Sequence, residues 1–355
     1  MMIINGAHGE GGGQILRSAV GLAAITGKAI NIHSIRAGRK KPGLAAQHLT
    51  AVRAAAMICD AVLHGDELGS TWLSFTPQSP PVAGLYEFNV ADARQGGSAG
   101  AATLVLQTVI PPLALADAPS TVTVRGGTHV PWSPPFHYLR DAYLPALARL
   151  GFRAGATLGR WGFHPAGEGE ITVNLPGGDR PTRPAAAWAN RGELVKISGV
   201  AVASSLPAHI AQRIRNRAAN LLDAAGLPHD IQPELARSTS PGAGIFLAAE
   251  YRHSRAGFGA LGAKGKPSEQ VAQEAVDDLL AFHAHGAAVD AHLADQLIVP
   301  LALSSGPGLI LPVQAITEHT RTNLWLVEQF LGPVARLDVE RNILEFFRKE
   351  KANRE

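Results

Sequence analysis

Apolar and polar positions follow the same order in three stretches of this chain. Each stretch has a polar or glycine-rich start, a glutamine, and an apolar segment long enough for about four helical turns. These first helices are expected to begin at Gln14, Gln107 and Gln296. β-like runs follow at 29–32, 120–124 and 308–311, and second helices at 43–59, 135–150 and 322–330. The pattern predicts an α/β fold built from three repeats.

The spacing of the glutamines predicts an inserted domain. Gln14 and Gln107 are 93 residues apart, whereas Gln107 and Gln296 are 189 apart, and the excess equals a small domain in size. Within it we expect a strand at 195–203, a helix at 207–225 and a strand at 244–251. The domain boundaries that we predict are a large domain at 1–183 and 269–345, an inserted α/β domain at 184–268 and a charged tail at 346–355.

Composition narrows the class of protein. With 46% hydrophobic and 17% charged residues the chain is globular, and no apolar run is long enough for a membrane span. The single cysteine, Cys59, excludes an intramolecular disulfide framework and a thiolate metal cluster. No signal-peptide pattern is present, so we expect a soluble, cytoplasmic protein without a membrane partner. The net charge of +3 permits an anionic partner, and positive charges gather in clusters at 36–41 and 213–217.

A glycine run opens the first predicted helix. Residues 9–18 read GEGGGQILRS, followed by IRAGRKKPGL at 35–44 and QHL at 47–49. Glycines before a helix let backbone N–H groups face an anion. Side-chain donors that suit phosphate oxygens accompany the run: Arg17, Arg36, Arg39 and Gln47. The segment therefore predicts a phosphate site, although it is not a Rossmann G-x-G-x-x-G loop, because Gln14 takes the third glycine position.

Each of these residues also fits an ordinary role when it is taken alone. Most arginines are exposed charges, and Glu10 within the glycine run fits a solvated loop carboxylate. His319 lies just before the apolar segment at 322–330, and a histidine at a helix start is more often a surface or capping residue than a catalytic one. Physical reasoning alone does not select His319 among the fourteen histidines.

The three N-terminal segments together resemble the signature GEGGGQILR…IRAGRxKPGL…QHL of the RNA 3′-terminal phosphate cyclases. The resemblance extends over roughly residues 3–180 and 270–340. It implies a large domain of three βαβαββ-type repeats, with a smaller α/β domain inserted between the second and third.

The resemblance also implies a reaction. His319 stands in the sequence HTRTN, which is similar to the family's H-x-x-T-N segment, whose histidine attacks the α-phosphate of ATP. The histidinyl-AMP passes AMP to an RNA 3′-terminal phosphate, forming an RNA-(3′)pp(5′)A anhydride. The neighbouring 2′-hydroxyl then attacks and leaves a 2′,3′-cyclic phosphate.

Further site residues follow from the same resemblance. Phosphate and RNA contacts are implied for Arg17, Arg36, Arg39 and Gln47, and ATP contacts for Gln107, Pro131, His292, Asp295 and Gln296. His292 stands where the family often has a tyrosine that stacks on adenine. A divalent cation, Mg²⁺ or Mn²⁺, is implied at Glu10 and Gln107.

Two other functions stay open. The first is a non-catalytic, cyclase-like factor that binds RNA during ribosomal RNA processing, and the presence of His319 argues against it. The second is an enolpyruvyl transferase, which shares related α/β repeats, although its motifs are absent. The sequence does not determine the physiological RNA, the preferred metal, the oligomeric state or the role of the inserted domain.

Overall fold

The computed structural model describes residues 1–94, 98–184 and 188–349. Its first unit consists of β1 (Met2–Asn5), α1 (Gln14–Thr26), β2 (Ile30–His33), α2 (Ala46–Met57), β3 (Val62–His64) and β4 (Leu73–Thr76). Strands β1 and β2 are parallel, and β4 runs antiparallel to both β2 and β3. The sheet order is therefore β1-β2-β4-β3.

The second unit repeats this arrangement. It consists of β5 (Leu85–Asn89), a 3₁₀ turn η1 (Val90–Ala93), α3 (Ala102–Leu115), β6 (Ser120–Gly126), α4 (Phe136–Tyr138), a π-helical turn η2 (Leu139–Tyr143), α5 (Leu144–Arg149), β7 (Gly155–Arg160) and β8 (Gly169–Leu175). The order β5-β6-β8-β7, with a parallel first pair, is that of the first sheet.

The third unit follows the same order in a reduced form. It consists of α8 (Ala291–Leu303), β13 (Leu309–Pro312), α9 (Glu318–Leu331), β14 (Ala335–Asp338) and β15 (Ile343–Phe346), with the order β13-β15-β14. A single parallel bridge between Val289 and Val313 takes the place of the first strand. The prediction of three βαβαββ-type units is confirmed.

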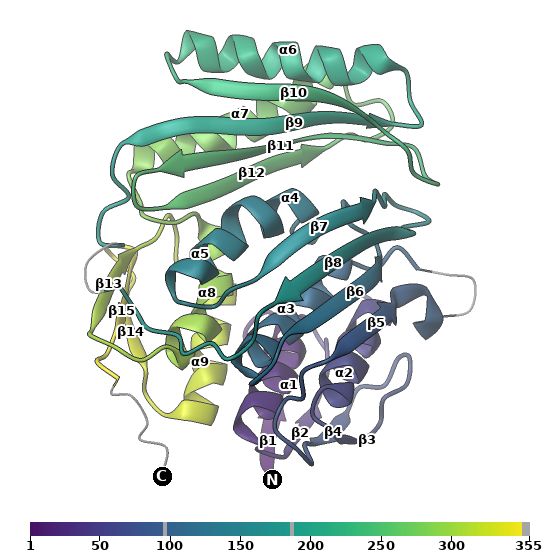
Figure 1. The fold of residues 1–355 in the computed structure, drawn as a ribbon, viewed down its shortest axis with the longest axis vertical. Helices are drawn as coiled ribbons and strands as arrows, with labels where there is room; N and C mark the ends of the chain where they lie inside the picture. Colours follow the sequence, from purple (N-terminus) through teal and green to yellow (C-terminus); the bar gives the residue numbers. More distant parts are fainter. Residues whose placement is uncertain (95–97, 185–187, 350–355) are drawn as a thin grey trace.

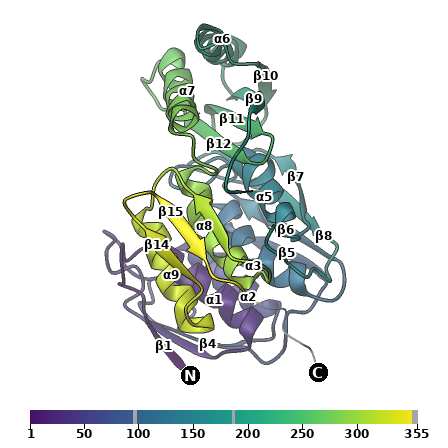
Figure 2. The same ribbon diagram turned by 90° about the vertical axis from the view of Figure 1, so that its left-hand side faces the viewer.

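Helices of all three units share one hydrophobic core, with the sheets on the outside (Figure 2). Leu16 of α1, Val105 of α3, Leu297 of α8 and Leu326 of α9 are each at most 2% exposed. This packing places α1 against α9, so the start of the chain meets a helix near its end. Within the described ranges, no helix is both long enough and apolar enough to cross a membrane.

A fourth sheet forms the inserted unit, drawn at the top of Figure 1. It consists of β9 (Leu194–Ser204), α6 (Ala208–Ala224), β10 (His229–Ala236), β11 (Gly242–Tyr251), β12 (Arg255–Leu261) and α7 (Ser268–His285), with the order β10-β9-β11-β12. The strands β9 and β11 and the helix α6 lie where the sequence indicated, whereas β10 and β12 were not predicted. The helix α7 shares a hydrophobic core with this sheet, whereas the boundary expected at residue 269 assigned it to the large domain. Its apolar face packs on the inserted sheet beside α6.

Two helix starts differ from the sequence expectation. Gln14 is the first residue of α1, as expected, but Gln107 and Gln296 are each the sixth residue of their helices. In α8 the actual start is set by Asp290, whose side chain accepts a hydrogen bond from the Leu293 backbone N–H at 2.9 Å. The glutamines of α3 and α8 therefore correspond to each other and not to Gln14.

Candidate active site

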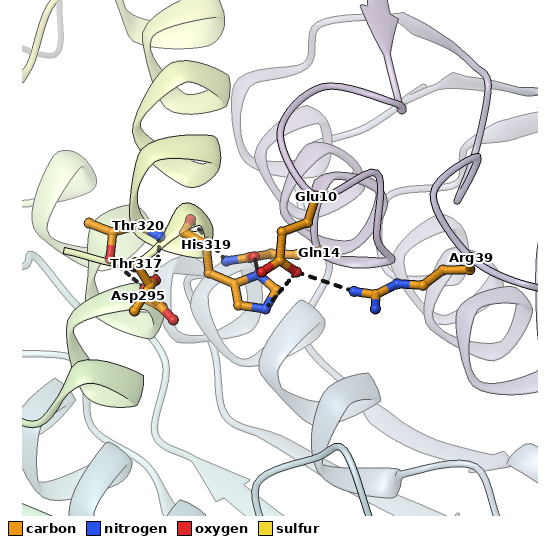
Figure 3. Close-up of polar contacts among 7 residues, drawn as sticks. All are labelled: Glu10, Gln14, Arg39, Asp295, Thr317, His319 and Thr320. Atoms are coloured by element: carbon orange, nitrogen blue, oxygen red, sulfur yellow. Dashed lines mark hydrogen bonds and ion pairs between the residues drawn. The ribbon is translucent and has the colours of Figure 1, made fainter. Parts of the chain in front are cut away.

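His319 lies in the first turn of α9, and not before the helix as the sequence indicated. The N-cap residue Thr317 accepts a hydrogen bond from the Thr320 backbone N–H at 3.1 Å. Asp295 of α8 accepts hydrogen bonds from the hydroxyls of both threonines and is only 6% exposed (Figure 3). Burial raises the pKa of Asp295, and the two hydroxyl donors oppose that shift. The start of α9, with His319 on it, is thus anchored to α8.

The imidazole of His319 faces two side chains of the N-terminal segment (Figure 3). Gln14 Oε1 contacts Nδ1, and the Gln14 amide N–H points at the His319 carbonyl oxygen, 3.5 Å away. This pairing assigns a proton to Nδ1, which donates to Gln14, so Nε2 is the nitrogen left for chemistry. Glu10 Oε2 lies 3.1 Å from Nε2 and 3.2 Å from Arg39 Nη2. The His319 side chain is 40% exposed and therefore accessible to a ligand.

The N-terminus of α1 lies beside His319, because Gln14 is the first residue of this helix. Its N-cap is Gly13, which has no side chain to cap the helix, and its first turn contains no acidic residue. The first N–H groups and the positive end of the helix dipole are therefore free to face an anion. Position 13 requires glycine, because a Cβ there would lie 2.0 Å from His48 Nε2.

The guanidinium groups of Arg17 and Arg39 lie beside Gly13 and Gly12 at this helix end, and Arg36 is near enough for its charge to act on Arg17. Arg17, Arg36 and Arg39 are called the site cluster below. Burial, and to a smaller extent the charge of Arg36, lowers the pKa of Arg17 to about 10. Burial and then the charge of Arg39 lower the pKa of Arg36. Among the residues that the structure describes, Glu10 is the carboxylate that pairs with the cluster, through Arg39. Uncompensated positive charge at an open helix N-terminus is typical of a phosphate site.

His48 of α2 is a further donor that the sequence analysis did not select. Its Nδ1 accepts a hydrogen bond from the Ala45 backbone N–H at 3.3 Å, so Nε2 carries the proton and faces Gly13. Burial, followed by the three charges of the site cluster, lowers the pKa of His48 well below its usual value and keeps the ring neutral. The available signal was a histidine near the start of an Ala-rich helix that follows a basic loop.

Gln14 was also missed as a site residue, although it stands inside the glycine motif. Its significance comes from contact with His319, 305 residues away along the chain.

Gln47 hydrogen-bonds to the backbone at the start of α3 and not to His319. Its Oε1 accepts a hydrogen bond from the Ala101 backbone N–H at 2.7 Å and so positions the start of α3, while its amide N–H groups stay available to a ligand.

The residues expected to bind ATP lie on separate elements. Gln107 of α3 donates a hydrogen bond to Gln296 of α8 at 2.6 Å, which joins the second and third units. His292 is exposed in the first turn of α8, and Pro131 is exposed in the loop after β6. Among these residues, Asp295 is the one whose side chain hydrogen-bonds to the start of α9, through Thr317 and Thr320.

A metal ion would meet a sparse set of protein ligands here. Within the described residues, no group of three or more His, Cys, Asp or Glu side chains could hold one. Glu10 contributes one carboxylate, while the partner of Gln107 is Gln296. Mg²⁺ commonly binds through one or two carboxylates and completes its shell with substrate phosphates and water. Glu10 therefore fits a hard cation that arrives with a nucleotide, and does not fit a closed protein cage.

Comparison with known proteins identifies the class. A family model described as RNA 3′-terminal phosphate cyclase matches residues 8–337. The chain is 52% identical over 339 residues to the RNA 3′-terminal phosphate cyclase of Methylococcus capsulatus, with coverage of 96% of this chain and 93% of that protein. It is 41% identical over 348 residues to the same-named protein of Pyrococcus abyssi, with coverage of 96% of each chain.

These matches define an enzyme family that spans bacteria and archaea. The chain belongs to the RNA 3′-terminal phosphate cyclase family. Among solved structures, the enolpyruvyl transferase NikO from Streptomyces tendae matches at 17% identity, with a TM-score of 0.27 and coverage of 62% of this chain and 38% of that one. A likeness this distant carries no argument about fold or function.

Proposed function

We propose that this enzyme converts the 3′-terminal phosphate of an RNA into a 2′,3′-cyclic phosphodiester at the expense of ATP. One observation carries the proposal: the His319 imidazole contacts Gln14, the first residue of the uncapped helix α1, and its Nε2 lies 3.1 Å from Glu10, which pairs with Arg39 of the site cluster. A nitrogen nucleophile and an anion site are thereby combined. Membership of the cyclase family supports the same reaction.

In the first step, Nε2 of His319 attacks the α-phosphorus of ATP. A P–N bond forms, the bond to the bridging oxygen breaks, and pyrophosphate leaves. Gln14 keeps the proton on Nδ1, so that the lone pair resides on Nε2. When the imidazole ring is doubly protonated, its second proton is on Nε2. Glu10 Oε2, 3.1 Å away, is placed to accept that proton.

In the second step, an oxygen of the RNA 3′-phosphate attacks the same α-phosphorus, and His319 leaves. In the third, the ribose 2′-oxygen attacks the RNA phosphorus and the anhydride P–O bond breaks. AMP leaves with the electron pair of that bond, and the 2′-hydroxyl proton passes to water. We infer that the site cluster and the α1 N-terminus stabilise the phosphate oxygens in all three steps. The required 2′-hydroxyl makes RNA the substrate rather than DNA.

Other expected ligands have supporting roles in this proposal. Glu10, with Gln107 as the other residue implied, would hold Mg²⁺ or Mn²⁺, which when bound neutralises charge on the leaving group. Gln107, Gln296, Asp295, His292 and Pro131 remain our candidates for contacts with ATP, and Arg17, Arg36, Arg39 and Gln47 for contacts with phosphate and RNA. We place the reaction in the cytoplasm.

A pair of matched RNA substrates tests the proposal. An oligoribonucleotide with a 3′-phosphate should become resistant to phosphatase in the presence of ATP and a divalent cation, because a cyclic diester has no terminal monoester. The same oligonucleotide with a terminal 2′-deoxyribose accepts AMP but lacks the internal nucleophile, so it should stop with AMP on its 3′ end. A non-catalytic RNA-binding factor would modify neither RNA. Phosphatase resistance of the 2′-deoxy substrate without retained AMP would contradict the proposed last step.

A further inference from the structure

Three consecutive residues of the glycine loop lie along one side of α9. Their partners on the helix are three residues apart, which keeps them on neighbouring turns. The pairs run in opposite directions along the two segments: His8 with Trp325, Gly9 with Thr322, and Glu10 with His319. The proposed reaction uses only the last pair. The other two pairs extend the contact away from the reacting nitrogen.

The outer pair is an aromatic stack. The rings of His8 and Trp325 have centroids 3.8 Å apart and planes inclined by 14°. His8 is exposed and Trp325 is half-buried, so the stack lies at the surface beside the site. Aromatic pairs in this geometry attract each other beyond their burial of apolar area.

The middle pair is a close contact without a polar anchor. Gly9 has a φ of +59°, and a Cβ there would lie 2.1 Å from Thr322 Oγ1, so the backbone of the loop rests directly on the helix. Thr322 is 4% exposed, and its hydroxyl is one of the described buried groups that have no hydrogen-bond partner. Van der Waals contact at Gly9 fixes the separation of loop and helix, but it does not fix their register.

The backbone of His8 is connected to the position of Glu10. The His8 carbonyl accepts a hydrogen bond from the Gly11 N–H at 3.2 Å, which closes the turn that contains Glu10. The His8 N–H in turn donates to the Asn5 carbonyl at the end of β1, also at 3.2 Å. A displacement of His8 therefore moves the turn and, with it, the Glu10 carboxylate beside His319.

We propose that His8 and Trp325 are positioning residues that set the register of the glycine loop on α9. Their stack holds Glu10 and the start of α1 at the reactive nitrogen of His319. The inference rests on the proposed function, because it assigns a role in the adenylylation step. Neither ring contacts the reacting atoms; both act through Glu10 and the backbone of the loop.

Five variants of the enzyme test the inference: four single substitutions and one double. His8→Ala and Trp325→Ala remove the stack, whereas His8→Phe and Trp325→Phe keep an aromatic ring at each place. In single-turnover adenylylation at saturating ATP, each alanine variant should lose about tenfold in rate, since small misplacements at a reacting centre cost up to about a hundredfold. The KM for ATP should change little, and the phenylalanine variants should recover most of the rate. The double alanine variant should be no slower than either single variant, because both remove one contact.

A second readout does not depend on activity. Amide hydrogen exchange at residues 9–13 should accelerate in His8→Ala and Trp325→Ala and stay near wild type in the phenylalanine variants. Trp72→Ala, which removes an exposed tryptophan elsewhere in the large domain, is the matched control and should change neither readout. Unchanged exchange in both alanine variants overturns the inference, as does an additive loss of rate in the double variant. If the wild type forms no enzyme–AMP, the proposed function fails, while the exchange result still decides whether the stack holds the loop.

Discussion

The arginines on α6 and those of the site cluster differ in the partners of their side chains. On α6, Arg213, Arg215 and Arg217, called the α6 cluster, face partners within the inserted unit. Arg213 makes a two-pronged ion pair with Glu269 of α7 at 2.8 and 2.9 Å, which raises the pKa of Arg213. Arg217 donates to Gln273 of α7 at 2.6 Å, and Arg215 to the Ile231 carbonyl at 3.3 Å. These arginines help to join α6 to its neighbours.

In the site cluster, Arg39 pairs with Glu10 and Arg36 donates to the Gly43 carbonyl at 2.7 Å, whereas Arg17 has no ion pair or side-chain hydrogen bond among the described residues. Burial and mutual repulsion lower the pKa values of Arg17 and Arg36, and both effects oppose the charged state. A folded protein retains such charges at a cost in stability, and a bound anion offsets that cost. The comparison teaches that the number of arginines does not identify a phosphate site. The feature that distinguishes the proposed phosphate site is positive charge that the protein itself compensates only in part.

Substitutions in the site cluster and in the α6 cluster should differ most in their effect on cyclisation activity. Arg17→Ala and Arg39→Ala should each reduce cyclisation by at least about tenfold, the effect of losing a charged hydrogen bond to phosphate of roughly 1.5–3 kcal/mol. The measurement is the rate of formation of phosphatase-resistant RNA ends under single-turnover conditions. Equal losses from these variants and from Arg213→Ala would indicate diffuse attraction of RNA instead of a defined site.

A smaller difference should be visible in the pH dependence of stability. The folded chain keeps His48 neutral, whereas the unfolded chain protonates it below its ordinary pKa of about 6.5. The unfolded state then binds more protons, so the free energy of unfolding should fall as the pH drops below about 6.5, by up to roughly 1.4 kcal/mol per pH unit for this histidine. Urea unfolding between pH 7.5 and 5 measures the slope, which His48→Gln should reduce by about one proton.

Two further buried histidines, His129 and His137, also make the free energy of unfolding fall at acid pH. They do so equally in the wild type and in His48→Gln. Burial is the main cause that lowers their pKa values, to about 3 for His137. His209→Gln, at an exposed position of α6, is the matched control and should leave the slope of the wild type unchanged. A slope in His48→Gln identical to that of the wild type would show that the folded chain does not hold His48 neutral.

The smallest effect should come from the α6 cluster itself. Arg213→Ala breaks an exposed ion pair, and exposed pairs contribute little, so cyclisation should stay within about twofold of wild type. The same single-turnover measurement applies. A loss as large as that of Arg39→Ala would place the α6 cluster in the RNA-binding surface together with the site cluster.

Local patterns account for the part of the fold that was predicted from the sequence. The alternation in β6 and the apolar periodicity of α6 depend on which residues face a core, and neighbouring residues carry that information. The start of α8 and the sheet that α7 covers depend on caps and partners elsewhere in the chain. For this reason Gln296 was placed at the start of its helix, and α7 was assigned to the large domain.

The candidate site also contains residues that local sequence indicates and residues that only long-range contacts bring in. The glycine run and its arginines are close in sequence, so the proposed phosphate site at residues 9–47 could be inferred from the sequence. Bottom-up reasoning did not select His319, which a family resemblance supplied. The contacts of Gln14 and His48 were not foreseen, because each depends on a neighbour that only the folded chain brings near. Sequence spacing contains no information on a contact between residues 14 and 319.

The most direct measurement follows the first covalent step. The enzyme is incubated with α-labelled ATP and Mg²⁺ or Mn²⁺, then digested, and the labelled peptide is identified. The account predicts an acid-labile, alkali-stable label on the peptide that contains His319, no label on folded His319→Ala, and normal labelling of the control His209→Ala. Retention of enzyme–AMP by His319→Ala, or a label on a different residue, would contradict the assignment of His319 as the nucleophile.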